Sequence, residues 1–409
     1  NFLIFDIHDE YDFIKDENIM KTIHIEDIAI DLKSLTIEDW INLVRPSDKV
    51  QLPILNQALR LAHIMQYDDE LHNAIKIYCA VETFKRHPTD GVVKRNLVIN
   101  LLSDSDFNAT VNFNLAEKYH ELYANIKDEH IEGFYNHVEK YYFTKFSFTY
   151  KEFHPYLLDE LSKSSPEINS LDNLLMGIDY LFIIEESHGN RNIRNHTSTL
   201  VTRIEEIKSR YENNLFNQSE TKKQELNEII TLNCTQPFVR FDISSLLNED
   251  LLFFSSYILE QLFKTQINNK DDKKLVHCIF DEAHQYIREH FQEERLQTLQ
   301  VFEKVAREGR KFGLFMIVIS QRPSELSQTV LSQCNNFILH RIRNGVDLEF
   351  MRKSIPYITN HQLVRLAYMK SGTALLVGEA FTIPMELKIN ADDEIKNITE
   401  TYLPSEVWL

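Results

Sequence analysis

The 409-residue chain carries 62 acidic against 44 basic side chains, a formal net charge of −18, and 43% of its residues are hydrophobic. This composition excludes a disordered or collagen-like chain, and at this length two domains are expected. The acidic balance does not indicate a nucleic-acid binder, although a ring-shaped motor can be acidic outside and basic along its channel.

The pattern of apolar and cysteine residues points to a protein of the cytoplasm. No apolar run approaches the roughly 20 residues of a membrane span, and no signal peptide is recognisable, so we expect no membrane partner. Four cysteines, scattered without metal-ligand spacing, are expected to be reduced thiols of a cytoplasmic protein.

Strand-like and helical segments divide the chain into four parts. A short apolar strand at Phe2–Phe5 ends at Asp6, within a first part that we place at 1–37. Charged and apolar residues then follow helical spacing over 38–235, strands alternate with helices over 236–390, and 391–409 is expected to be a C-terminal tail. We therefore predict an α/β fold: a mostly parallel sheet with helices on both faces, interrupted by a large all-helical insertion.

Two acids follow the apolar run 275–280, which is typical of a buried parallel strand. Open α/β sheets bind their ligands at the carboxyl ends of the strands, so Asp281 and Glu282 are candidate catalytic residues. Asp281 suits the outer sphere of Mg²⁺, and Glu282 can orient or deprotonate an attacking water. The alternative is a strand that simply ends in solvated acids.

An amphipathic basic helix and a second apolar strand come next. Gly309 is expected to end the helix, which leaves Arg307 in its last turn and Arg310 in the turn before the strand. An arginine at a subunit boundary can reach a neighbour's triphosphate, and we prefer Arg307 to Arg310 for this role. A solvated basic helix face is the alternative. The second strand stops at Ser320 and Gln321, whose amide could sense the γ-phosphate or hold the water.

Several segments, taken in order, resemble the HerA-type ATPases, a branch of the HerA/FtsK superfamily of ring-shaped DNA pumps. The segments are Phe5–Tyr11, Phe241–Leu246, Phe280–His284 as the Walker B motif, Ala306–Gly313, Ser320–Ser324, Leu339–Asp347 and Gly372–Gly378. The resemblance covers the first dozen residues and about 200–390. It implies a RecA-like core, ATP and Mg²⁺ as cofactors, and a homohexamer that threads double-stranded DNA through its pore.

The resemblance also assigns further roles. It implies an arginine finger acting in trans, a position for Asp6 close to the phosphates, and a second arginine, Arg341, near the nucleotide. Relatives in bacteria often accompany a nuclease or a sirtuin-type NADase in anti-phage defence. We therefore expect an ATP-driven DNA translocase or helicase that works with such an effector. The alternative is a ring-shaped scaffold that assembles and regulates the effector, with ATP hydrolysis secondary.

One family feature is missing from the 409 residues. No Gly-x-x-x-x-Gly-Lys-Ser/Thr motif occurs, although the family carries this phosphate-binding loop before the strand at residue 2. Three explanations stay open: the sequence is a piece of a longer chain, it omits segments and has been renumbered, or the protein is a pseudo-ATPase. Without the loop, this polypeptide is expected to bind ATP poorly.

Overall fold

The computed structural model describes residues 1–12, 14–86, 91–119, 128–269, 274–288, 297–355 and 358–389, without the side chains of 128, 248, 249 and 297–299. The expected tail, 391–409, lies outside these residues. The chain separates into two compact units, one made of Asn1–Ala29 with Ser219–Leu409 and the other of Ile30–Gln218. The sequence-based bounds of the insertion, 38–235, differ from this division because α10 (Glu220–Ile230) falls in the first unit.

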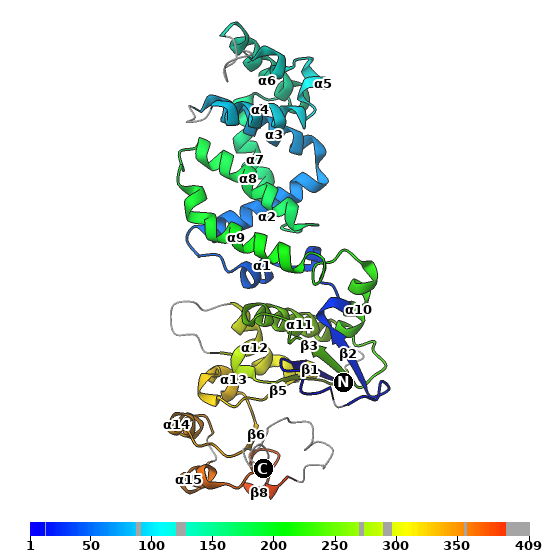
Figure 1. Ribbon diagram of the computed structural model, residues 1–409, viewed down its shortest axis with the longest axis vertical. Coiled ribbons are helices and arrows are strands. Elements are labelled where there is room, and N and C mark those ends of the chain that lie inside the picture. The colour runs from blue at the N-terminus through cyan, green and yellow to red at the C-terminus, as the bar shows by residue number, and fades with distance from the viewer. Residues whose placement is uncertain are drawn as a thin grey trace, which may run out of the picture. The chain divides into compact units, whose positions relative to one another are not determined.

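The first unit is built on a five-stranded parallel sheet. Its strands are β1 (Phe2–Asp6), β2 (Met20–His24), β3 (Phe238–Asp242), β4 (Val276–Phe280) and β5 (Leu314–Val318), in the order β2-β3-β1-β4-β5. Figure 1 shows β1 and β2, from the start of the chain, in one sheet with β3. The predicted fold class, a mostly parallel α/β sheet interrupted by a helical region, is confirmed.

The core of this unit lies under one face of the sheet. Phe241 stacks edge-on against Phe254 of α11 (Asn248–Asn268), and Phe280 does so against Phe302 of α12 (Gln297–Glu308). On the opposite face, burial decreases towards β5, which lies at the edge of the sheet: Ile317 is 39% exposed. The sheet therefore has one fully packed face and one that is open near β5.

The remainder of the first unit follows β5. After α13 (Gln328–Ser332), a second sheet forms from β6 (Asn336–Leu339), β7 (Thr373–Gly378) and β8 (Met385–Lys388), all antiparallel, with α14 (Gly345–Ser354) and α15 (Asn360–Tyr368) between β6 and β7. β7 and β8, which follow one another in the chain, pair as an antiparallel hairpin.

The second unit is helical throughout its described residues, as the spacing of its apolar residues predicts. Its α-helices are α1 (Ile37–Val44), α2 (Gln51–Tyr67), α3 (Asp69–Lys85), α4 (Gly91–Ser103), α5 (Phe107–Val111), α6 (Asp128–Phe146), α7 (Tyr150–Lys163), α8 (Leu171–Ser187) and α9 (Ile193–Tyr211). Gly177 lets α8 approach α2 closely, because a Cβ there would lie 2.8 Å from the Ala58 carbonyl oxygen. Tyr142 is fully buried and donates to the Ala74 carbonyl at 2.7 Å.

Candidate active site at the carboxyl edge of the sheet

Polar side chains stand at the carboxyl ends of all five parallel strands. β2 ends at His24, β3 at Asp242 and β1 at Asp6, and these three residues are in register. Asp281 follows β4 directly, and Ser320 comes two residues after β5. The expectation that the Asp-Glu pair and the Ser-Gln pair meet at one edge is confirmed, because β4 and β5 are parallel neighbours.

The Asp281 carboxyl group lies in a desolvated and negatively charged setting. Asp281 is 8% exposed, and burial raises the pKa of its carboxyl group above the ordinary range. The N–H of Glu282 donates to it at 2.9 Å and opposes this rise, whereas Glu10, Glu282 and Asp6 add to it. A cation would relieve the same repulsion, so the site favours a positively charged ligand.

Glu282 connects the two strand ends. Its backbone is left-handed, with φ +42°, which turns the chain sharply after β4. Gln321 donates from Nε2 to Glu282 Oε1 at 2.6 Å. Oε2 is buried and accepts no hydrogen bond from the described residues, although His284 Nδ1 lies 3.0 Å away, outside hydrogen-bond geometry. The carboxylate is thus held at one oxygen by Gln321, while its other oxygen is buried beside His284.

His284 belongs to the same edge and was not among the predicted site residues. It is 9% exposed, and its Nδ1 also lies 3.3 Å from the Ser320 hydroxyl. The imidazole therefore lies between the two strand ends. The signal in the sequence was its position, two residues after Glu282 and at the end of the Walker B segment.

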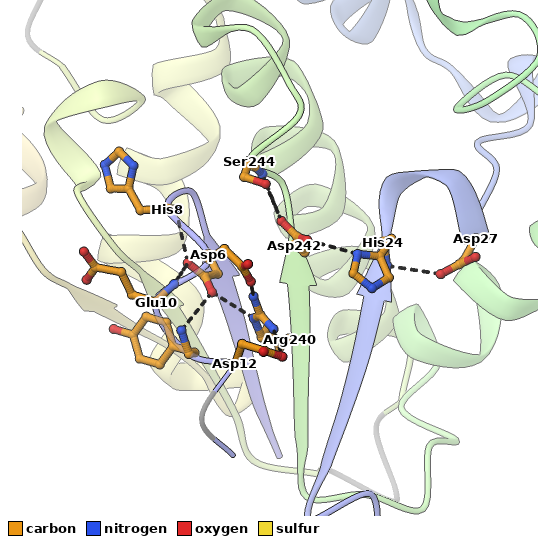
Figure 2. A network of polar contacts seen from close by, with 11 residues as sticks. Asp6, His8, Glu10, Asp12, His24, Asp27, Arg240, Asp242 and Ser244 are labelled. Carbon is orange, nitrogen blue, oxygen red and sulfur yellow. Dashed lines mark hydrogen bonds and ion pairs between the residues drawn. The ribbon is translucent and has the colours of Figure 1, made fainter. Parts of the chain in front are cut away.

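Asp6 is fully buried and saturated with hydrogen bonds. Its carboxylate accepts the backbone N–H groups of His8, Glu10 and Tyr11 at 3.1–3.2 Å, so the chain after β1 wraps around it (Figure 2). Arg240 on β3 donates to the same carboxylate at 2.8 Å. These contacts make Asp6 the centre of a turn beside the Asp281 edge, and a direct contact with a nucleotide stays a prediction.

The predicted arginines lie outside this hydrogen-bonded group. Arg307 ends in the last turn of α12, and Arg310 lies in the short 3-10 helix Gly309–Phe312 that follows, as the glycine predicts. Both side chains are exposed, and within the described ranges neither guanidinium makes a hydrogen bond or an ion pair. They are therefore free to contact another molecule.

Arg341 follows β6 and is also exposed. Among the described residues no side-chain partner is found for it. The neighbouring segment is anchored differently: buried Asp347 accepts the Ser324 N–H at 3.1 Å and the Asn344 amide at 2.8 Å. Asp347 thus ties the start of α14 to the loop that leaves Gln321, while the predicted nucleotide contact of Arg341 stays a prediction.

The sequence is similar to curated helicases over part of its length. It is 34% identical over 118 residues to the DNA double-strand break repair helicase HerA of Pyrococcus furiosus, which covers 29% of this chain and 21% of that protein. The HerA of Sulfurisphaera tokodaii is 23% identical over 248 residues, 59% of this chain and 48% of that protein. Part of the chain is therefore similar to HerA helicases. The chain spans less than half the length of the curated relatives it matches.

Other comparisons add less. No family model matches the chain. VirB4 of Thermoanaerobacter pseudethanolicus overlaps 97% of this chain and 83% of its own at 13% identity and a TM-score of 0.46. The genome packaging NTPase B204 of Sulfolobus turreted icosahedral virus 2 overlaps 41% and 72% at 17% identity and a TM-score of 0.31. Among the described residues, no helix has both the length and the apolar character needed to cross a membrane.

The residues of this site fit a magnesium ion that is shared with a nucleotide. Mg²⁺ is usually held by one or two carboxylates together with phosphates and waters, rather than by a complete cage of protein ligands. Asp281 provides such a carboxylate, and no cluster of three or more His, Cys, Asp or Glu ligands occurs in the described part of the chain. The ion would neutralise phosphate charge at this edge.

Proposed function

We propose that this HerA-like chain forms the motor part of an ATP-driven translocase or helicase that acts on double-stranded DNA as a homohexameric ring. The single observation that carries the proposal is the Glu282–Gln321 hydrogen bond, at 2.6 Å, beside the buried Asp281 at the carboxyl edge of a parallel sheet. An acid that is positioned by a neighbouring strand, next to a site that favours a cation, is what hydrolysis of a triphosphate requires.

Each residue has a defined role in this proposal. Asp281 holds Mg²⁺ through the water molecules bound to the ion, and Glu282 orients the attacking water. Gln321 fixes the orientation of Glu282 or contacts the γ-phosphate. Asp6 lies close to the phosphates, and Arg341 is a second arginine near the nucleotide. The phosphate cradle itself has to come from a glycine-rich loop, which the 409 residues do not contain.

The two exposed arginines support the proposed ring. Arg307 and Arg310 are exposed and without partners among the described residues, which suits a finger offered to the next subunit. We assign the finger to Arg307 first and to Arg310 second. Such a group contributes on the order of 10³–10⁵ in rate when it stabilises the charge of the transition state.

The partners are inferred from the resemblance to HerA-type proteins. We propose that double-stranded DNA passes through the pore and that the ring works with an effector protein, a nuclease or a sirtuin-type NADase. The helical unit, Ile30–Gln218, is an addition large enough to bind such a partner. The setting we propose is anti-phage defence in the bacterial cytoplasm.

A second candidate function follows from the same resemblance to HerA-type proteins. The chain could form a ring-shaped scaffold that assembles and regulates the effector, with ATP hydrolysis secondary. The ATPase rate of the full-length protein, with and without double-stranded DNA, separates the two functions. Stimulation by DNA that is abolished by Glu282→Ala and by Arg307→Ala supports the motor. Effector activity that survives both substitutions supports the scaffold.

A further inference from the structure

An arginine is buried in the middle of the parallel sheet. Arg240 lies on β3, between β2 and β1, in a strand whose other residues are mostly apolar. Its side chain is 1% exposed. Burying a charge costs several kcal/mol unless it is well paired, so an arginine at this position needs a reason beyond packing.

All three nitrogen groups of this side chain face carboxylates of one short turn. Nε donates to Asp6 at 2.8 Å, one terminal nitrogen contacts Asp9, and the other lies 3.5 Å from Asp12. Figure 2 shows the guanidinium among the acids that follow β1. Arg240, on the neighbouring strand β3, therefore holds the segment 6–12 in place.

Asp6 alone does not account for the arginine. Its carboxylate already accepts three backbone N–H groups, which is enough to stabilise a buried negative charge. Asp9 and Asp12 are 56% and 68% exposed and could be solvated without a partner. The contacts with Asp9 and Asp12 instead fix the path of the turn, which passes through a left-handed residue at Asp9, with φ +58°.

The fixed turn presents two side chains to the catalytic edge. Glu10 and Asp6 are among the charges that act on Asp281. Asp6 and Asp281 follow the paired residues Phe5 and Phe280 of adjacent parallel strands, so the turn lies beside Asp281. Burial together with the nearby Asp281 carboxylate raises the pKa of Tyr11 to about 12. The turn is thus next to the acid that we assign to the metal.

We propose that Arg240 is a positioning residue: it holds the turn 6–12 so that Tyr11 and Glu10 set the orientation of Asp281. The inference rests on the proposed function for its effect on catalysis, but the clamp itself is a property of this chain. A guanidinium suits the task because its fixed fork meets several carboxylates at once, whereas a lysine offers one point charge.

The first experiment measures the clamp without any catalysis. 3-Fluorotyrosine is incorporated in place of Tyr11 in the 409-residue chain, and its ¹⁹F resonance is recorded. Asp281→Ala, which removes the carboxylate near Tyr11, defines the resonance of the ring without this neighbour. Arg240→Lys and Asp9→Asn are expected to shift the resonance toward that reference. Asn tolerates the left-handed backbone at position 9, so Asp9→Asn tests the ion pair without straining the turn.

A matched control removes an ion pair elsewhere in the same unit. Lys21 on β2 pairs with Glu225 on α10, and Glu225→Gln breaks this contact without touching the turn. This variant is expected to keep the wild-type resonance. The clamp is refuted if Arg240→Lys and Asp9→Asn also keep it while their melting curves show that both variants are folded.

The second experiment measures catalysis in the full-length protein. Arg240→Lys is expected to lower kcat for ATP about tenfold, and Asp9→Asn several-fold, because a small misplacement of an acid is expensive in rate. KM for ATP should change less than about twofold, since the phosphate cradle is untouched. An equal loss in Glu225→Gln would reduce the effect to one of stability and contradict the proposal.

The two experiments fail independently. If the full-length wild-type protein hydrolyses no ATP, the proposed function is wrong, yet the ¹⁹F shifts still decide whether the clamp exists. If ATP is hydrolysed and kcat is the same in Arg240→Lys and wild type, the clamp has no catalytic role and the inference is wrong.

Discussion

Gln321 and Glu282 come from adjacent parallel strands, and their side chains meet at 2.6 Å. The bond joins the two segments that the sequence separates by an amphipathic helix. The second oxygen of Glu282 lies 3.0 Å from His284 Nδ1, so the acid is placed between residues of both strand ends. The consequences of this arrangement can be measured.

Gln321→Ala should slow ATP hydrolysis by the full-length protein about tenfold or more. The substitution removes the donor that fixes Glu282, so the acid gains rotamers and loses its orientation towards the water. Steady-state ATPase rates test this. Gln333→Ala is the matched control, because Gln333 is an exposed glutamine whose side-chain amide donates, among the described residues, to Ser332 alone. An unchanged rate in Gln321→Ala would remove this residue from the site.

The inactive variants Glu282→Ala and Arg307→Ala should regain ATPase activity when they are mixed. If Glu282 acts from one subunit and Arg307 from the next, rings that contain both Glu282→Ala and Arg307→Ala subunits include some intact seams. ATPase activity should therefore reappear on mixing and re-assembling the two proteins. A double variant that carries both changes cannot contribute such a seam and is the control. Mixtures that stay as inactive as their components would argue against an arginine acting in trans.

Gly309→Ala should disturb the turn that carries Arg310. A Cβ at this position would lie 2.6 Å from the Leu314 carbonyl oxygen, a backbone atom that cannot move without shifting β5. We expect a loss of stability of about 1–3 kcal/mol, the usual cost of overpacking, and a lower ATPase rate below the melting temperature. Chemical denaturation measures the first effect. Gly133→Ala, where nothing lies within 4 Å, should be neutral or slightly stabilising.

The 409-residue chain should bind ATP weakly. Asp281 can share a metal with phosphates, but the backbone amides and the lysine of a phosphate-binding loop are absent from this sequence. Isothermal titration is expected to show no binding at micromolar ATP. Micromolar affinity in this chain would mean that other residues hold the triphosphate, and the assignment of the site would have to change.

The helical unit should lose stability as the pH falls. Burial lowers the pKa of His72 on α3 from 6.5 to about 4, Lys76 adds to this effect, and Nε2 is buried with no hydrogen-bond partner in the described part of the chain. The unfolded chain therefore takes up a proton at a higher pH than the folded chain does. The resulting loss begins near the unfolded pKa and grows until the pH reaches about 4.

His72→Gln should remove part of this loss. Its melting temperature is expected to fall less between pH 7 and pH 5 than that of the wild type. His196→Gln, which changes an exposed histidine of the same unit, is the control and should follow the wild type. If His72→Gln and wild type show the same pH dependence, the buried imidazole is not the group responsible.

Much of the fold could be predicted because its signals are local. The apolar run before Asp281 and the helical spacing of residues in the insertion are properties of single segments, and both elements form as expected. Strand order is different. That β1 lies between β3 and β4 depends on contacts between distant segments, which periodicity does not contain.

The same difference between local signals and long-range contacts applies to the residues of the candidate site. Asp281, Glu282 and Gln321 follow apolar strands and could be identified as residues at a shared edge. The roles of His284 and Tyr11 could not be identified in this way. The contact of His284 with Ser320, and the position of Tyr11 near Asp281, depend on how separate segments fold together. Arg240 was not among the predicted site residues, although a charged residue within the apolar strand Phe238–Asp242 could have pointed to it. The catalytic roles of the site residues stay predictions.

The position of β5 has a practical consequence for anyone who purifies these residues alone. Ile317 and Ile319, in and just after this edge strand, are 39% and 41% exposed, and a bare apolar edge is a template for strands of other molecules. We expect the polypeptide to aggregate through this edge as its concentration rises. A lysine at position 319 would protect it, since charged residues on outer strands discourage such pairing.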